Sequence, residues 1–533
     1  MPAEVRRAVP VGILAALLAV GLVAGGLERF VVSTTSLAEQ YVRALGPQSL
    51  PLKAQTLTLQ RAALAETNVL PIYGTSELYC CGQPYNAATF FQHAPTGFSV
   101  FNVGYPVTED LFWAQTFGAL GNELRGKRLV VSDSPWFMSP GGIAPQAYAH
   151  TFSPEIAEVF TFDAPIPMRL RGAVARRMLA FPTTLQGRVL LVHALRAAAH
   201  GGWRGLAGYW LLDPTGRLAA WGLEIQDAVE TRALLEPVRL PKHILQRAVA
   251  SKPAGVGTGW LRRLLHLPPA TGNEPLWRLV SDPRYAGAPI DPYVPIRPQT
   301  INWNTVLQQA TQAAAASTRS NPFGVATSQW QHCTDIQPVG GSQCASALAL
   351  YRQGRSNHDG TVYPLPRSWV EGVITCTCWT DLDLEFEMLR AVHAQPMAWV
   401  QPIQGALADE TPYSAQARRV VYDRYLAIAR AEGIPATTFQ THDTDPLFIN
   451  SFGHLSQRGW VYADRLLDLF WHGRLPEVAA EMSRGGSVDA LFPPALNCPH
   501  PTWCEGVDNV PPLAGELADL PIGLALPLPA QGR

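Results

Sequence analysis

The chain is short of charge in general and of lysine in particular. Charged residues make up 16% of its 533 residues, and only four of its 41 basic residues are lysines. The formal net charge is −1. Nucleic-acid-binding proteins need a basic surface to neutralise phosphates, and this chain has no basic excess from which to build one. We therefore exclude nucleic acid as a partner.

Long uncharged apolar runs are also scarce, and the clearest one lies at the N-terminus. Residues 8–27 carry no charge and, as a helix, are long enough to cross a hydrocarbon layer of roughly 30 Å. Arg6 and Arg7 precede the run, which favours an amino end inside the cell. We expect a cytoplasmic segment 1–7, a single-pass anchor 8–27 in the plasma or inner membrane, and a periplasmic, extracytoplasmic body. A cleaved signal peptide is the alternative, although no clear Ala-x-Ala site follows.

A second apolar stretch runs from Val189 to Leu212. Arg196, His200 and Arg204 interrupt it. Ionisable side chains are expensive inside a bilayer, so we expect an interior or interfacial helix here and not a second span.

The sequence has no paired C-x2-C spacing, which argues against a structural zinc site. Its cysteines are even in number, and an extracytoplasmic location permits disulfides. They are Cys80, Cys81, Cys333, Cys344, Cys376, Cys378, Cys498 and Cys504. We expect the pairs at 80–81 and 376–378 to bond to each other across the fold, and the last pair to clip the tail. We expect no metal and no cofactor.

Strand and helix patterns alternate in two separate regions. The expected strands are Asn68 to Tyr73, Phe98 to Val103, Leu129 to Ser132, Met397 to Val400 and Ala436 to Gln440, with helices at Val107 to Leu124, Asp381 to Val392, Ser414 to Glu432 and Ser456 to Trp471. Strand, helix and strand in that order imply a parallel sheet with crossovers. The fold class is therefore α/β, with one doubly wound parallel sheet.

A long insertion separates the two regions that form the sheet, and it determines the expected domain boundaries. We expect a stalk at 28–66, the first half of the α/β domain at 67–152, a mostly helical insertion at 153–330, the second half at 331–475 and a Pro-rich C-terminal extension at 476–533. Within the insertion, residues 268–298 are rich in proline and read as irregular.

Ser76 is the first candidate for chemistry. It follows an apolar strand and Gly74, within Gly74-Thr75-Ser76-Glu77-Leu78. Ligands of open α/β sheets bind beyond the carboxyl ends of the strands, where this hydroxyl would stand. The alternative is that Thr75 or Ser76 merely caps the next helix.

A nucleophilic serine needs a base, and His454 is placed to be one. It stands in a loop just before the last amphipathic helix, whose start can reach the top of the sheet. Imidazole can accept the serine proton near neutral pH and return it to a leaving group. The alternative is a loop histidine that caps its helix.

These segments together resemble the DltD family. The residues that carry the resemblance are Leu70-Pro71-Ile72-Tyr73-Gly74-Thr75-Ser76-Glu77-Leu78, Asn102-Val103-Gly104, Val131-Ser132-Asp133-Ser134-Pro135-Trp136-Phe137, Trp379-x-Asp381, Gln401-Pro402-Ile403-x-Gly405 and His454-Leu455-Ser456 with Gly459-Trp460. The resemblance implies an SGNH-hydrolase-like fold with one N-terminal membrane anchor and an outward body. It also implies work beside a membrane-bound O-acyltransferase and transfer of D-alanine to teichoic acid.

The same resemblance implies roles for individual residues. Ser76 would be the nucleophile, Gly104 would supply an oxyanion amide and His454 would be the base. Ser134 and Trp136 would line the substrate site.

The chain departs from the SGNH pattern in two places. The position three residues before the histidine is Ser451, where an aspartate is usual, and the usual third-block asparagine is not evident. We expect Asp445, or else Asp443, to orient His454; a Ser-His dyad without a carboxylate is the alternative.

Three functions follow from these observations. The first is an acyltransferase that moves an acyl group, D-alanyl or one as simple as acetyl, from an acyl donor to an envelope glycopolymer acceptor. The second is a periplasmic esterase or thioesterase of the same fold. The third, suggested by the missing aspartate, is a non-catalytic scaffold in a membrane acyltransferase complex.

Overall fold

The computed structural model describes most of the chain between its two ends. The described residues are 3–79, 84–139, 142–236, 296–320, 369–408, 414–449, 454–476, 488, 491–500, 504 and 506–507. Four of the eight cysteines (Cys80, Cys81, Cys333 and Cys344), nearly all of the Pro-rich stretch 268–298 and most of the C-terminal extension lie outside them.

A five-stranded parallel sheet forms the centre of the molecule. Its strands are β1 (Val69–Gly74), β2 (Ser99–Gly104), β3 (Arg128–Asp133), β4 (Gln395–Val400) and β5 (Ala436–Thr438), in the order β2-β1-β3-β4-β5. The chain builds outward from β1 to β2 and then returns to add β3 on the other side. The reversal between β1 and β3 is the point at which ligands bind in doubly wound folds.

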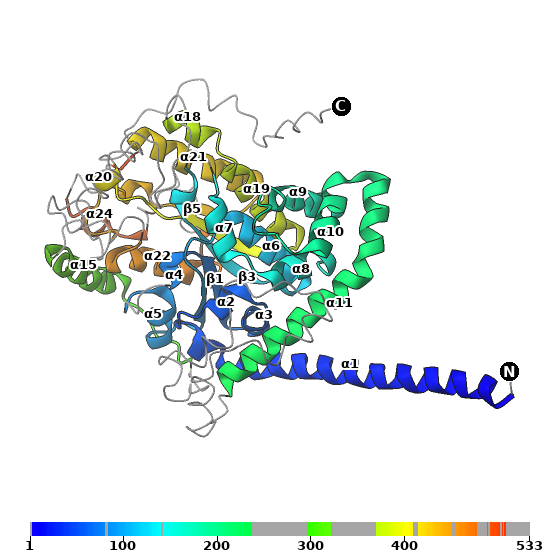
Figure 1. Ribbon diagram of the computed structural model, residues 1–533. Coiled ribbons are helices and arrows are strands. Elements are labelled where there is room, and N and C mark those ends of the chain that lie inside the picture. The colour runs from blue at the N-terminus through cyan, green and yellow to red at the C-terminus, as the bar shows by residue number, and fades with distance from the viewer. Residues whose placement is uncertain are drawn as a thin grey trace, which may run out of the picture.

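Helices cover both faces of this sheet (Figure 1). Tyr73 and Val131 face one helical layer, while Leu70, Ile72 and Val130 face the other. The first layer includes α6 (Asp110–Leu120), α19 (Cys378–Ala391) and α21 (Ala415–Ala431); the second includes α5 (Ala87–His93), α15 (Trp303–Ser320) and α22 (Gln457–Trp471). Because both faces are buried, the strands read as continuous apolar runs and not as alternating ones. The α/β fold class and its doubly wound sheet are confirmed.

The elements expected from the sequence lie close to their expected positions. The first helix of the sheet domain shows the largest difference: α6 spans Asp110–Leu120, and a 3-10 turn, η1 (Gly121–Leu124), completes the expected stretch. All of α6 is buried, and a Cβ at Gly118 would stand 2.6 Å from a ring carbon of Phe160. This helix therefore packs in the middle of the molecule, between the sheet and the inserted helices.

The described part of the insertion is mostly helical. Its helices are α8 (Pro154–Phe162), α9 (Met168–Met178), α10 (Val189–His200), α11 (Gly202–Leu235) and α15. The second apolar stretch forms two helices, because Gly201 and Gly202 adopt φ of +63° and change the direction of the backbone there. Proline stands inside α11 at Pro214.

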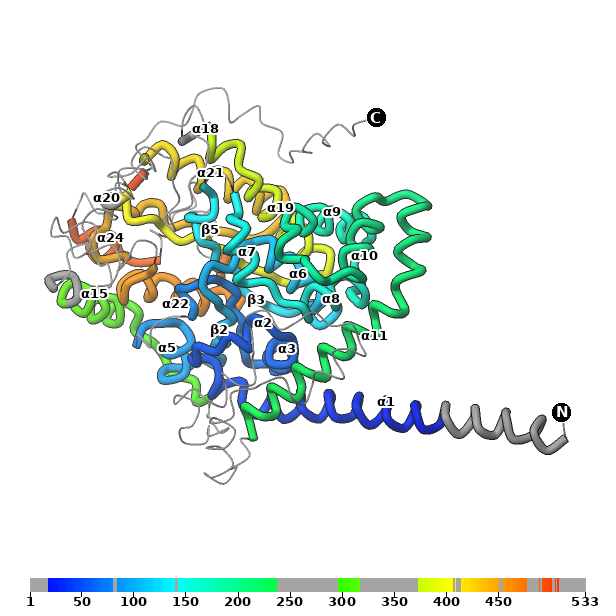
Figure 2. The backbone as a smooth tube through the Cα atoms, viewed as in Figure 1, coloured from blue at the N-terminus to red at the C-terminus, as the bar shows by residue number. Residues whose placement is uncertain are grey.

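The N-terminal helix α1 (Ala3–Leu45) is continuous for 43 residues and runs through the expected anchor into the expected stalk. It leaves the body as a long projection (Figure 2). Within the described residues it is the one helix long and apolar enough to cross a membrane. Its Leu22 and Val23 are largely exposed, while Ala38 and Val42 enter the core of the body.

Two of the expected disulfide arrangements fall on described residues, and one of them is wrong. Cys498 and Cys504 form the expected clip in the tail. Cys376 and Cys378 bond to each other at the start of α19, so our hypothesis that they bond to the 80–81 pair is wrong. Two cysteines separated by one residue are close enough to bond locally, and this link constrains one turn, not two halves of the domain.

Candidate active site

The turn after β1 is shaped by a glycine and a buried glutamate. β1 ends at Gly74, and the short helix α4 (Ser76–Tyr79) begins two residues later. A Cβ at Gly74 would stand 2.3 Å from Glu77 Oε1 and 3.0 Å from the Ser132 carbonyl oxygen, so a side chain there requires a shift. Glu77 Oε1 also accepts a hydrogen bond of 2.9 Å from the Thr75 amide. Ser76 is thereby held at the carboxyl end of β1, at the reversal of strand order.

Gly104 touches the same turn from the neighbouring strand. It pairs with Gly74 in the register of β1 and β2. A Cβ at Gly104 would stand 2.5 Å from Leu78 Cβ and 2.7 Å from the Thr75 carbonyl oxygen. Only a residue without a side chain allows β2 to lie this close to the turn that carries Ser76.

The structure brings Ser76 and His454 together. Ser76 Oγ lies 2.8 Å from His454 Nε2, although 378 positions separate the two residues. Burial lowers the pKa of His454, which keeps the imidazole neutral and able to accept a proton at neutral pH. The two side chains selected from the sequence therefore lie within hydrogen-bonding distance of each other.

The loop that carries His454 is fixed on both sides. Leu455 forms an antiparallel bridge with Ile449. Ser456 is the residue before α22, and its Oγ accepts hydrogen bonds from the Arg458 and Gly459 amides. Capping of α22 is therefore done by Ser456, and the alternative in which His454 is the helix cap is wrong.

Neither expected carboxylate orients His454. Asp445 Oδ2 accepts a hydrogen bond of 2.9 Å from Arg458 Nε, and Oδ1 accepts one of 2.8 Å from the Leu447 amide. Asp443 Oδ2 accepts one of 2.8 Å from Arg418 Nε. Both aspartates and both arginines are buried, and in each ion pair the arginine balances the charge of its aspartate. The expectation that Asp445 holds His454 is contradicted by these contacts.

The pKa of Asp445 agrees with a structural role. Burial opposes ionisation of this carboxyl, but hydrogen bonds and charge from His442 and Arg458 outweigh it and lower the pKa. The carboxylate therefore stays ionised beside Arg458. The one sequence signal for another partner of this aspartate was Arg458, an arginine four residues beyond His454.

Ser134 and Trp136 lie at the same edge of the sheet as Ser76. Ser134 directly follows β3, which pairs with β1, and precedes the 3-10 turn η2 (Pro135–Phe137). Both side chains are half-buried. That they line a substrate site, as the resemblance implies, stays a prediction.

A set of buried acids lies behind the serine turn and was not predicted. Burial raises the pKa of Glu77 to about 7, even though hydrogen bonds from Thr75 and others favour its ionised form. Asp133, at the end of β3, accepts a hydrogen bond of 2.6 Å from Tyr425 Oη, and burial raises its pKa to about 7. Glu77 contributes to that rise through its charge.

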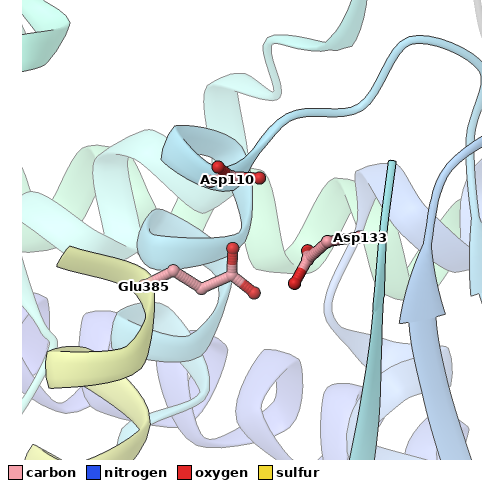
Figure 3. A group of neighbouring side chains, drawn as sticks. All are labelled: Asp110, Asp133 and Glu385. Atoms are coloured by element: carbon pink, nitrogen blue, oxygen red, sulfur yellow. The ribbon is translucent and has the colours of Figure 1, made fainter. Parts of the chain in front are cut away.

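Asp133 belongs in turn to a cluster of three carboxyls, which Figure 3 shows pointing toward one another. Asp110 comes from the first turn of α6 and Glu385 from α19, and the three groups offer ligand atoms that lie within 4.8 Å of one another. Among the residues that the structure describes, neither oxygen of Glu385 has a hydrogen-bond partner. Burial, followed by the neighbouring charges, raises the pKa of Asp110 and of Glu385. The cluster can share protons or take up a cation.

Sequence reasoning missed this cluster because its members stand far apart in the chain. One local signal was present. Glu385 is surrounded by Leu382, Leu384, Phe386 and Leu389, all of which are buried. An acid on the apolar side of an otherwise well-formed helix indicates a buried polar contact.

Comparisons with known proteins agree with one another on the family that the chain resembles. A family model described as DltD protein matches residues 49–346 and 377–472, a range that includes Ser76, Gly104 and His454. Protein DltD of Bacillus subtilis (strain 168) is 23% identical over 423 residues, which cover 79% of this chain and 87% of that protein. Protein DltD of Lacticaseibacillus rhamnosus is 28% identical over 178 residues, which cover 33% of this chain and 40% of that protein.

Proposed function

The chain belongs to the DltD family, and from that premise we propose that it is a serine O-acyltransferase that places D-alanyl or a similar acyl group on an envelope glycopolymer. The observation that carries the proposal is the 2.8 Å contact between Ser76 Oγ and His454 Nε2 at the reversal of strand order. A hydroxyl hydrogen-bonded to a neutral imidazole at the mouth of an α/β sheet is the minimum equipment for acyl transfer.

The first half-reaction acylates the enzyme. His454 accepts the Ser76 proton while Ser76 Oγ attacks the carbonyl carbon of the acyl donor. The oxyanion that forms lies near the Gly104 strand end, where a backbone amide would stabilise it. The bond to the donor's leaving group then breaks, the imidazolium returns its proton to that group, and the acyl ester of Ser76 remains.

The second half-reaction delivers the acyl group. A hydroxyl of the glycopolymer replaces the leaving group, and His454 removes its proton as the oxygen attacks the Ser76 ester. Collapse of the second oxyanion breaks the bond to Ser76 Oγ, which recovers the proton from His454. The acceptor leaves as an ester and the enzyme is restored.

We infer that the site works as a dyad. Asp443 and Asp445 are both held by buried arginines, and their described contacts do not include His454. Without a carboxylate the imidazolium lacks its usual stabilisation, which is consistent with the lowered pKa of His454. The base would then hold its proton only briefly in each half-reaction.

The proposal includes location and partners. We propose that α1 anchors the chain with the body outside the membrane, as Arg6 and Arg7 before the apolar run indicate. A membrane-bound O-acyltransferase beside it would supply the acyl group. An outward site explains how a polymer of the envelope reaches Ser76.

A serine-reactive fluorophosphonate probe tests the nucleophile. We expect the probe to label the wild-type chain and to fail on Ser76→Ala, with unchanged thermal melting of that variant. Ser134→Ala removes the other half-buried serine at this edge of the sheet and should keep the label. Labelling of Ser76→Ala at the wild-type level would disprove the proposal and favour the scaffold function.

The molecule that receives the acyl group, polymer or water, distinguishes a transferase from a hydrolase. A labelled acyl donor should lose its acyl group much faster when a polymer acceptor is present, and the label should appear as an ester on that acceptor. If release is the same with water alone, the chain is an esterase or thioesterase with the same dyad.

A further inference from the structure

Helix α11 carries an apolar surface that the body does not cover. Trp203 is 75% exposed, Trp210 58%, Leu211 83% and Leu218 64%. At 100° per residue these four side chains lie within one arc of the helix, opposite the buried Gly205, Tyr209, Asp213 and Gly216. Contiguous exposed aromatic and aliphatic side chains mark a binding surface, because water does not stabilise them.

This surface carries little negative charge, because the two acids near its end, buried Asp213 and exposed Asp163, both pair with Arg217. From Val189 to Leu212 the sequence holds no aspartate or glutamate. The exposed charged groups in that stretch are cationic: Arg196 on α10 and Arg204, whose guanidinium lies 5.3 Å from the centre of the Trp203 ring. Tryptophan beside arginine is the combination that settles at the boundary between acyl chains and anionic headgroups.

The position of α11 agrees with that chemistry. Its second half packs on α1, where the Arg232 guanidinium lies 5.8 Å from the centre of the Phe30 ring. From there its first half reaches outward on the side toward which α1 projects (Figure 1). The first half of α11 and the projecting part of α1 therefore lie on one side of the body (Figure 1).

We propose that the first half of α11, Gly202 to Leu218, lies in the outer leaflet of the bilayer that α1 crosses. The occupant of its apolar face is lipid. With α1 alone the body would be free to turn about its anchor; a second, lateral contact fixes the orientation of the sheet edge relative to the membrane. This inference rests on the proposed anchoring of α1.

Photocrosslinking in nanodiscs tests the contact on the full chain. Benzoylphenylalanine is placed at Leu211, at Leu22 in α1 and at Gln226, an exposed polar position on α11. We expect acyl-chain adducts at Leu211 and Leu22, several times more abundant than at Gln226. Adducts at Leu22 with none at Leu211 would overturn the inference and leave the anchor intact. No adduct at either position would mean that α1 itself is not in the bilayer.

The same probe in cells distinguishes lipid from protein. Adducts with lipid at Leu211 support the inference, whereas a single protein adduct there would show that a partner covers the surface and would overturn it. The double variant Leu211→Glu with Leu218→Glu changes two exposed positions, so the fold should melt normally. We expect it to keep fluorophosphonate labelling of Ser76 while losing most transfer to a membrane-held acceptor.

Discussion

The molecule contains two sets of buried acids, and the charged groups that face each set differ. Asp443 and Asp445 each face a buried arginine, and the pKa of Asp445 is lowered. Asp110, Asp133 and Glu385 face one another, and their pKa values are raised. Burial is similar in the two sets, so the partner decides the protonation state. The first set is ionised and holds loops in place; the second is a store of protons behind the serine turn.

The largest effect on transfer should come from Ser76 and His454, which belong to neither set of acids. His454→Ala removes the base and should lower transfer by about a thousandfold or more, since general-base assistance to a serine is lost. His472→Ala changes a more exposed histidine just beyond the other end of the same helix and should keep wild-type rates. Steady-state kinetics on both variants, with thermal melting, decides this. Equal rates for the two would remove His454 from the mechanism.

The ionised set should matter for stability and little for turnover. Asp445→Asn leaves the Arg458 charge buried without its partner and should lower the free energy of unfolding by roughly 3 kcal/mol. Turnover per folded molecule should stay near the wild-type value, because Asp445 does not contact His454. Denaturant unfolding and kinetics at a temperature below the melt measure the two separately.

A control completes that comparison. Combining Asp445→Asn with Arg458→Gln should cost less than the sum of the two single changes, because the unpaired charge is removed. A large fall in turnover for Asp445→Asn alone, with normal stability, would restore the triad and contradict the dyad.

The protonated set should make stability fall as pH rises. Asp133 has a pKa of about 7 in the folded chain, against an ordinary value of 3.8, so the fold binds its proton more tightly than the unfolded chain does. This stabilisation is complete below about pH 4 and is lost by about pH 7, a change of up to roughly 4 kcal/mol. Asp133→Asn keeps an acceptor for Tyr425 and should flatten that part of the curve. Unfolding measured from pH 4 to 8 shows whether the two curves differ.

The smallest effect is expected at Glu385. Glu385→Gln replaces a carboxyl without a described hydrogen-bond partner by a neutral group that can donate to Asp110 or Asp133, and should raise stability at pH 8 by about 1 kcal/mol. Thermal melts with and without EDTA accompany the test. The opposite result would be a strong loss of stability in Glu385→Gln and an equal loss when EDTA is added to the wild type. That result would identify the cluster as a cation site.

Much of the fold follows from local pattern. The five strands are buried on both faces, so they appear as short apolar runs next to turn residues such as Gly74 and Gly104. The serine and histidine were found because both stand at ends of such elements, where the topology of a parallel sheet collects side chains.

The parts that could not be predicted depend on contacts distant in sequence. Asp445 was chosen as the nearest acid to His454, but the buried Arg458 lies on the adjoining helix and takes that carboxylate. Asp110, Asp133 and Glu385 come from three elements, and no spacing in the chain connects them. Sequence patterns report the face on which a residue lies, and seldom the residue across from it.

The order of the strands also bears on how the chain folds. β3 pairs with β4 in the register Arg128 to Gln395, so about half the chain must be synthesised between two adjacent strands. Until β4 arrives, the edge of β3 is open to wrong pairing. Distant contacts of this kind slow folding, because loop closure must precede the gain from pairing. We expect refolding to be slow and prone to aggregation, with the inserted helices forming first and the sheet closing last.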